Sequence, residues 1–590
     1  MSKNNPTCSR NRNERVGVYA FGEEKKTGRR EFIKKTSTLT FLAMTAPLLA
    51  YANEGEANDR LEINRSRAIG KGKANLITIL QTSDIHAQLY THDEFFVENG
   101  QVLYKKRGGL AVLKTMVNAI RSENPKNTIL IDGGDCFQGG GLAALTEGRA
   151  MVPLMNNMGY DLILPGNWEV VYRKEMMLKD LGGYNAVKIC ANMFHQNDNS
   201  TDGDLIFEPY WIKFIAGIKI GFIGYTDPAV PKRQPPAFSK GIRYAKPIES
   251  VAKYVSILRE YEQCAMIFLV THLGLAQEVN FANQVQVNGV DHILGGDTHE
   301  RVRQPIKGKY ATVSQPGAFG SFVSRFDLVV EDGKVKDKIY QLLDVDPEKY
   351  RPDEQMVALI EKERAPFREQ LDVEIGTSKL PLVRYYVIET PMDNMITDAL
   401  MWKFKPDVSI SNGFRFCPPL IPDKKTRLAV ITMDYLWSMV PVNGEIKSGL
   451  VLGKQLWDWL EIELHNVFAK NPAERFGGWM VRMQGMHVNF TMNNDLGKRL
   501  NWVTIGNEPI NFERYYKVLT CEREGDPDDT LCRLGSVKEP TLIDSDLHKT
   551  IIEYLKVHSP ISPRIDGRVT ATDAPPGLLS QLEGYGYEFF

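Results

Sequence analysis

The stretch Leu76-Ile77-Thr78-Ile79-Leu80-Gln81-Thr82-Ser83-Asp84-Ile85-His86 decides the fold, because its short apolar run ends in an Asp-x-His pair. Helical spacing further along is clear at 111–123 and 247–263. Apolar runs of this length, separated by helices, predict the strands of an α/β sheet. Four later segments follow the same plan, with an apolar run before Gly133-Gly134-Asp135, Gly166-Asn167-Trp168-Glu169, Thr271-His272-Leu273-Gly274 and Gly295-Gly296-Asp297-Thr298-His299.

The polar residues behind these runs are types of side chain that bind metal ions. Ligands of open α/β sheets collect outside the carboxyl ends of the strands, so we expect the five loops to meet. Asp, Asn and His in this number suit a pair of divalent ions. The expected metal ligands are Asp84, His86, Asp135, Asn167, His272, Asp297 and His299.

The spacing divides these ligands between two ions. Asp84 and His86 are two residues apart at a strand end, where alternate side chains face the same way, so we expect both on one ion with His299. Asp135 has two carboxylate oxygens and follows two glycines, which predicts a bridge between the ions. Two ions about 4 Å apart generate hydroxide near neutral pH and clamp the attacking and leaving atoms of a displacement. The second ion is assigned the remaining ligands, Asn167, His272 and Asp297.

The composition argues against two classes of partner. The chain has 590 residues, 43% of them hydrophobic, so it is long enough for several domains with filled cores. The net charge is −1, which gives no electrostatic reason to bind nucleic acid or an anionic membrane surface. No later apolar stretch reaches about 18 residues, so we expect no stable membrane anchor.

The first 52 residues have the layout of an export signal. The paired arginines of Gly28-Arg29-Arg30-Glu31-Phe32 precede an apolar stretch at 39–49, and Ala50-Tyr51-Ala52 offers small residues for cleavage. This order predicts a twin-arginine signal peptide at 1–52 and a periplasmic protein exported in the folded state.

Changes in composition and in the pattern of apolar residues predict the remaining domain boundaries. The strand–helix alternation and all five ligand segments occupy 73–343. A charged and helix-permissive segment at 344–370 is predicted to be an interdomain helix or linker, and a second domain spans 371–570. In that domain Cys521 and Cys532 bracket a polar, turn-rich loop. In an oxidising compartment such a loop predicts a disulfide between the two cysteines.

The ordered ligand set resembles that of the calcineurin-like metallophosphoesterases. Arg107-Gly108-Gly109-Leu110, Glu389-Thr390-Pro391-x-x-Asn394 and Asn412-Gly413-Phe414-Arg415 add a resemblance to the 5'-nucleotidase branch. The resemblance implies an α/β fold with a four-layer αββα metal domain. It also implies a 5'-nucleotidase-type C-terminal α/β domain that supplies the substrate pocket.

Trp168 departs from that family, which has histidine after Gly-Asn to assist phosphoryl transfer. Gly-Asn-Trp-Glu, the block 475–482 and the twin-arginine leader look like the SoxB branch of sulfate thiol esterases. This resemblance implies two manganese ions, with zinc as the alternative, and a sulfonate substrate on a carrier-protein cysteine. It assigns catalysis to Asp135, Asn167, Trp168 and Arg415, with Arg482 as a further candidate for binding substrate.

Asp297 is a second departure from the family pattern, and the sequence leaves two alternative functions open. The family has histidine at the position of Asp297, so an additional negative charge is expected in the site. A periplasmic 5'-nucleotidase or another phosphoesterase is the first rival, with Phe414 and Phe416 available to stack a nucleotide base. A non-catalytic binding protein that has kept the metals is the second.

Overall fold

The structure is a computed structural model that describes residues 74–98, 101–196, 203–412, 417–477 and 479–573. The described residues belong to one compact unit, whose first half contains two six-stranded sheets. The first sheet has the order β16 (Lys334–Asp344), β15 (Phe322–Glu331), β1 (Ala74–Thr82), β4 (Thr128–Asp132), β5 (Leu162–Ile163) and β6 (Val187–Lys188). The second has the order β13 (Ile306–Lys307), β14 (Thr312–Ser314), β12 (His292–Leu294), β11 (Met266–His272), β9 (Ile218–Thr226) and β8 (Tyr210–Ile215).

Strand direction brings the ligand segments to one end of each sheet. Strand β1 runs parallel to β4, and β4 runs parallel to β5. In the second sheet β11 runs parallel to both β9 and β12. Parallel neighbours end at the same edge, so the loops that follow them start close together.

The side chains of β11 show why these sheets lie between helices. Phe268 belongs to a core cluster with residues of the first sheet and meets Phe326 edge-on at 6.0 Å between ring centroids. Its neighbours Ile267 and Leu269 point the other way, into a second cluster with α7 (Val251–Ser256) and α8 (Leu275–Ala282). A strand that is apolar on both faces is expected where both faces are covered.

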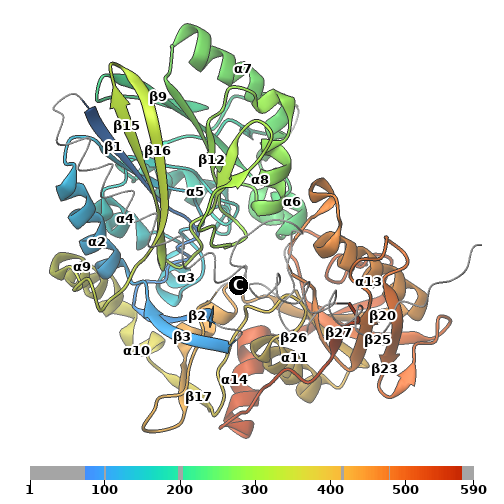
Figure 1. The fold of residues 1–590 in the computed structure, drawn as a ribbon. Coiled ribbons are helices and arrows are strands. Elements are labelled where there is room, and N and C mark those ends of the chain that lie inside the picture. The colour runs from blue at the N-terminus through green and yellow to red at the C-terminus, as the bar shows by residue number, and fades with distance from the viewer. Residues whose placement is uncertain (1–73, 99–100, 197–202, 413–416, 478, 574–590) are drawn as a thin grey trace, which may run out of the picture. The chain divides into compact units, whose positions relative to one another are not determined.

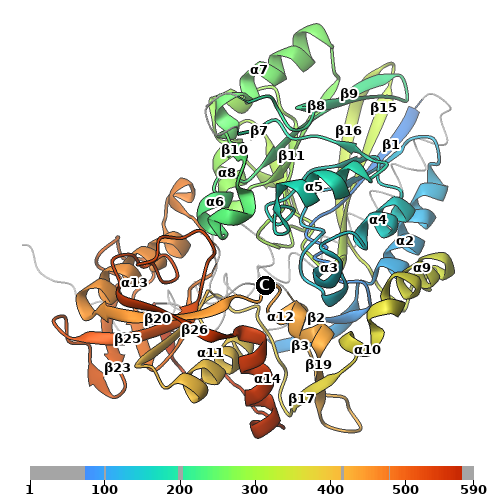
Figure 2. The ribbon, with the colours of Figure 1, turned by 180° about the vertical axis from the view of Figure 1, so that it is seen from behind.

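Helices on the outer sides of the two sheets complete the layers (Figures 1 and 2). Helices α2 (Leu110–Glu123) and α4 (Met151–Met158) cover the first sheet, while α7 and α8 cover the second. The predicted four-layer αββα order is therefore confirmed. The other helices of this half are α3 (Gly141–Thr146), α5 (Arg173–Gly182) and α6 (Val230–Arg233).

The segment 247–263 is not the single α-helix that its spacing predicts. It divides into a 3₁₀ turn at Pro247–Glu249, α7, and a π-helical turn at Ile257–Tyr261. Ser250 separates the first two in a non-helical conformation, with φ at −127°. Apolar spacing sets which face packs inward, but it does not distinguish the three kinds of helical turn.

The charged segment after the first half forms α9 (Glu354–Arg364) and α10 (Arg368–Leu371). Asp353 caps α9, because its side chain accepts a hydrogen bond from the backbone N–H of Met356. Met356 and Ile360 pack into the core of the first half, so the connection is an anchored helix.

The second half contains a five-stranded and a four-stranded sheet. The first has the order β21 (Arg482–Gln484), β18 (Val408–Ser411), β25 (Tyr515–Cys521), β20 (Glu445–Leu452) and β26 (Lys538–Asp546). The second has the order β24 (Glu508–Pro509), β23 (Leu500–Ile505), β22 (Met486–Phe490) and β27 (Val569–Ala571). Its helices are α11 (Pro391–Phe404), α12 (Met433–Met439), α13 (Gly453–Phe468) and α14 (Leu547–His558).

Short two-stranded pairs complete the structure: β2 (His92–Glu98) with β3 (Gln101–Arg107), β7 (Met193–His195) with β10 (Ile242–Tyr244), and β17 (Glu374–Ser378) with β19 (Ala429–Thr432). Among the helices that the structure describes, none combines the length and apolar character needed to span a bilayer.

Candidate active site

The predicted ligands sit on loops with an unusual backbone. Strand β1 ends at Thr82, so Asp84 and His86 are not neighbours on one face of a strand as predicted. Their φ angles are 56° and 50°, in the left-handed region that non-glycine residues rarely adopt. Such residues cost about 1–3 kcal/mol each and persist only where the surrounding structure holds them. The same region holds Asp135 (φ 61°), Asp297 (φ 86°) and His299 (φ 64°).

The glycines of these motifs let the loops approach one another. Gly134 has φ at 101°, and a Cβ atom there would lie 2.4 Å from the backbone nitrogen of Gly166. At Gly166 a Cβ atom would lie 2.3 Å from a carboxylate oxygen of Asp135. Side chains at either position would therefore push the loops apart.

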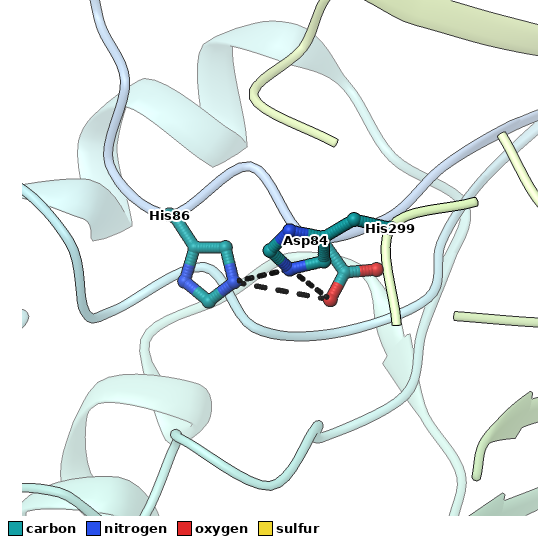
Figure 3. A group of neighbouring side chains, drawn as sticks. All are labelled: Asp84, His86 and His299. Carbon is teal, nitrogen blue, oxygen red and sulfur yellow. Dashed lines mark hydrogen bonds and ion pairs between the residues drawn. The ribbon is translucent and has the colours of Figure 1, made fainter. Parts of the chain in front are cut away.

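Asp84 makes close approaches to three histidines, and Figure 3 shows its carboxylate with two of them, His86 and His299. Its Oδ1 atom is 3.4 Å from Nε2 of His299, 3.7 Å from Nε2 of His272 and 3.9 Å from Nε2 of His86. The Nε2 atoms of His86 and His299 are 3.1 Å apart. Oδ2 of Asp135 completes the cluster, 3.1 Å from His272 Nε2 and 3.7 Å from His86 Nε2.

The carboxylate oxygens and Nε2 atoms of this cluster are arranged as ligands of metal ions. They form two groups, Asp84 with His86 and His299, and Asp84 with Asp135 and His272. Oδ1 of Asp84 is fully buried, yet it makes no hydrogen bond with any described residue. A buried carboxylate oxygen without a donor is costly unless a cation binds it. In this arrangement Asp84 belongs to both groups, whereas the sequence pattern predicted Asp135 as the bridge.

Backbone carbonyls orient the rings of two of the three histidines so that Nε2 faces the cluster. Nδ1 of His86 lies 2.9 Å from the carbonyl oxygen of Gln138, and Nδ1 of His272 lies 2.8 Å from that of Gly133. Each Nδ1–H therefore donates to the backbone and turns Nε2 toward the cluster. Burial lowers the pKa of His272, but the charges of Asp135 and Asp84 outweigh burial and hold that pKa well above its usual value, so Nε2 of His272 carries a proton beside Asp135 that a bound metal ion would replace. Burial, and after it the charge of His299, lower the pKa of His86 to about 3, so its ring is neutral.

Asn167 and Asp297 lie at the edge of this cluster. The amide of Asn167 donates to Oδ1 of Asp297 at 2.6 Å, and that oxygen is 4.0 Å from Nε2 of His272. The other oxygen of Asp297 accepts a 2.8 Å hydrogen bond from Arg233. Both predicted ligands are thus close to the second group but are engaged with protein side chains.

Two buried carboxylates that the sequence pattern missed as site residues hold the loops together. Glu169 accepts hydrogen bonds from the backbone N–H groups of Asp135 at 3.0 Å, Cys136 at 2.7 Å and Gly166 at 2.6 Å. Glu278 accepts from the Thr271 hydroxyl and the Gly296 N–H. Glu169 is visible in its motif, but its role depends on a loop distant in sequence.

A pocket opens over the cluster, and Trp168 is part of its wall. Trp168 is 5% exposed, and its backbone N–H donates to Oδ1 of Asp135 at 2.7 Å. The same pocket is lined by Arg233 and, from the second half, by Asn412, Glu463, Asn466, Phe476, Trp479 and Arg533. The sequence pattern did not single out Arg233 or Arg533.

The next residues are those of the second half that were predicted to bind substrate. Phe414, Arg415 and Phe416 lie outside the described residues. Arg482 is 1% exposed, and the prediction that it binds substrate is wrong in this structure. It donates to the carbonyl oxygens of 386 and 387 and lies 3.2 Å from Asp393, so its charge is used inside the domain.

The predicted disulfide is not formed, since Cys521 and Cys532 are both free thiols. Cys521 ends β25, while Cys532 packs into the hydrophobic cluster of the second half. The loop between them is closed by other bonds. Leu531 and Leu534 exchange backbone hydrogen bonds around a turn, and Arg533 pairs with Glu463 at 2.6 Å.

Comparison with known proteins agrees with this architecture. Residues 77–301 match the calcineurin-like phosphoesterase family and 373–522 match the 5'-nucleotidase C-terminal domain. The trifunctional nucleotide phosphoesterase YfkN of Bacillus subtilis is 25% identical over 576 residues, which cover 89% of this chain and 37% of that protein. This chain therefore spans little more than a third of that relative.

Two solved structures from Thermus thermophilus share the fold. One is the sulfate thiohydrolase SoxB, at a TM-score of 0.75 and 21% identity, covering 85% of this chain and 98% of that one. The other is a 5'-nucleotidase precursor, at a TM-score of 0.72 and 21% identity, covering 85% and 100%. Since both fit about equally well, the fold does not distinguish a sulfur substrate from a nucleotide.

Proposed function

We propose that this chain, a metal-dependent hydrolase with a calcineurin-like phosphoesterase domain and a 5'-nucleotidase C-terminal domain, releases sulfate from a thiosulfonate on a partner protein's cysteine. The observation that carries the proposal is the buried Trp168 in the pocket over the metal ligands, where a nucleotidase of this family has histidine. A thiolate or persulfide leaves more readily than an alkoxide. Such a substrate therefore needs less help from an acid.

The buried cluster fits the two divalent ions that calcineurin-like phosphoesterases bind. We assign Asp84, His86 and His299 to one ion and Asp84, Asp135 and His272 to the other, with Asn167 and Asp297 beside the second. When bound, two such ions supply hydroxide near neutral pH and electrostatic stabilisation of the reacting group. Manganese is the metal we propose, with zinc as the alternative.

The chain's own residues orient the substrate. The pocket is lined by Asn167, Trp168 and Arg233 from the first half and by Asn412 and Phe476 from the second. Amide and guanidinium donors suit the oxygens of a sulfonate, while the indole of Trp168 and the ring of Phe476 line a passage for an extended protein arm. Arg415, next to this wall in sequence, is a further donor in this proposal.

The proposed partner is a sulfur-carrier protein that presents a cysteine on a flexible arm. The proposed compartment is the periplasm, because the leader at 1–52 has paired arginines before its apolar stretch. The same leader allows metal loading before export.

A periplasmic 5'-nucleotidase is the second candidate. The relative YfkN is named a nucleotide phosphoesterase, and the Thermus 5'-nucleotidase precursor has the same two-domain fold. If the protein is a 5'-nucleotidase, the second half holds the base and sugar of the nucleotide, with Phe414 and Phe416 stacking on the base.

A direct comparison of two substrates tests the proposal. Manganese-loaded protein is incubated in parallel with AMP and with a carrier whose cysteine bears a thiosulfonate, and phosphate and sulfate release are measured. We expect sulfate release with little phosphate, and neither product from an Asp135→Ala variant, which controls for contaminating hydrolases. Ready hydrolysis of AMP without turnover of the carrier would reverse the assignment.

A further inference from the structure

Arg233 occupies a central place in the pocket. It ends α6 and lines the pocket over the metal ligands together with the two pockets that adjoin it. Its Nη1 atom donates to Asp297 at 2.8 Å and lies 3.2 Å from a carboxylate oxygen of Asp227. Its guanidinium carbon is 5.5 Å from the ring centroid of Phe476. These contacts fix the guanidinium at the mouth of the metal site.

Part of this guanidinium remains available. The Nε atom of Arg233 is buried and makes no hydrogen bond with any described residue. A buried donor without an acceptor is costly in a folded protein, and because Arg233 also lines the pocket over the metal ligands, a ligand bound in that pocket can supply the acceptor. The hydrogen-bonding pattern of guanidinium matches the oxygens of a tetrahedral anion.

The described part of the pocket contains one other cation, Arg533, which lies against Glu463, and no evident acid. Apart from the metal-cluster residues and Asp297, its ionisable side chains among the described residues are Arg233, Glu463 and Arg533. Both oxygens of Glu463 accept hydrogen bonds from Arg533, at 2.6 and 3.2 Å. Trp168 stands where the family's histidine would donate a proton, and an indole N–H does not ionise in water.

We propose that Arg233 binds the oxyanion of the substrate and stabilises its developing negative charge, and that the site, whose described residues offer no proton donor for the leaving group, selects esters whose leaving group departs as a stable anion. The inference rests on the proposed function, since it explains which substrate class the same pocket takes. A guanidinium keeps its charge and its proton, so it stabilises an anion but does not protonate a leaving group.

The reaction balances without an added acid. For a carrier cysteine, R–S–S–SO₃⁻ and OH⁻ give R–S–S⁻ and HSO₄⁻. The water-derived oxygen forms a new bond to the terminal sulfur. The bond from that sulfur to the next one breaks, and its electron pair leaves with the persulfide. An alkoxide leaving group lacks this stability, and a positioned acid contributes about 10²–10⁴-fold to its departure.

A series of leaving groups tests this selectivity. Metal-loaded wild type and Trp168→His are compared on 4-nitrophenyl phosphate, phenyl phosphate and AMP, and kcat/KM is measured for each. We expect wild-type rates to fall steeply from the nitrophenyl ester to AMP. Trp168→His should raise the ratio of kcat/KM for AMP to kcat/KM for the nitrophenyl ester at least about 10-fold. A wild type that hydrolyses AMP as fast as the nitrophenyl ester would overturn the inference.

Anion binding tests Arg233 without relying on turnover. Sulfate is titrated by calorimetry into metal-loaded wild type, Arg233→Met, Arg233→Lys and the surface control Arg368→Met, with metal content measured in each. We expect two ions in all four, sulfate affinity at least about 10-fold weaker in Arg233→Met, and an intermediate affinity in Arg233→Lys. Arg233→Lys keeps the charge and therefore serves if Arg233→Met does not fold. Equal sulfate affinities in wild type and both Arg233 variants would overturn the role of Arg233.

The two proposals fail separately. A steep leaving-group dependence without turnover of the carrier thiosulfonate would overturn the carrier assignment and leave the inference intact. A shallow dependence with good carrier turnover would overturn the inference alone.

Discussion

Buried polar side chains behave differently in the two halves of the molecule. In the first half they converge at Asp84, whose Oδ1 atom has no hydrogen-bond partner among the described residues. In the second half Asp393 is equally buried, but it accepts hydrogen bonds from Thr390 and Arg384 and pairs with Arg482. Burial alone therefore does not mark a functional residue. A buried carboxylate oxygen without a hydrogen-bond donor does when it lies within a cluster of metal-ligand side chains, because a bound cation compensates for its desolvation.

The largest effect expected from this contrast is at Asp135. We predict that Asp135→Ala abolishes turnover and lowers bound metal from two ions to one or none, because hydrolysis by a two-metal site needs both ions. Metal content by elemental analysis and product release check this. Asp495→Ala, a surface substitution in the second half, should change neither, and full metal content with normal turnover in Asp135→Ala would refute the site.

Arg482 tests the buried residues of the second half that have partners within the protein. We predict that Arg482→Met lowers the free energy of unfolding by about 3 kcal/mol, since it breaks a buried ion pair and removes two hydrogen bonds to backbone carbonyls. Asp393 keeps Arg384 as a partner, which limits the loss. Denaturant unfolding measures the change, with the exposed Arg514→Met as control. Unchanged stability with a raised KM would restore a substrate-binding role.

His292 tests whether a buried polar residue of the first half has a structural role when its polar atoms have hydrogen-bond partners within the protein. This buried histidine has both ring nitrogens within 2.8 Å of hydroxyls, those of Thr312 and Ser314, so we expect a structural role. Burial, and then the charge of Lys338, lower its pKa to about 3 from 6.5. Between these values the unfolded chain binds a proton that the folded protein does not.

The folded protein should therefore lose about 1.4 kcal/mol of stability through His292 for each pH unit below 6.5, down to about pH 3. The gap in unfolding free energy between wild type and His292→Gln, both metal-free, should change by that slope from pH 6.5 to 4.5. A gap that stays constant with pH would show that His292 titrates alike in both states.

The smallest effect is expected at the cysteines of the second half. Since Cys521 and Cys532 are free and buried or half-buried, replacing both by serine should change the unfolding free energy by less than about 2 kcal/mol, with no dependence on reductant. Thiol titration of the unfolded, unreduced protein should count both cysteines. Finding both oxidised would restore the disulfide.

The sequence determined the parts whose chemistry is local. The types and order of Asp84, His86, Asp135, His272 and His299 follow from what binds divalent ions at strand ends, and the structure brings all five together. Apolar runs likewise predicted the strands, because a strand covered on both faces must be apolar along its length. The match to two known domain families agrees with that fold.

Only the tertiary structure decided the parts that depend on partners distant in sequence. It places Arg233 against Asp297, 64 residues away, and Glu169 against the N–H of Asp135, 34 residues away. It also shows that Arg482 is consumed inside a domain. An arginine reads the same in sequence whether it binds a substrate or a buried carboxylate, because its role is set by which acceptors the fold brings within hydrogen-bonding distance.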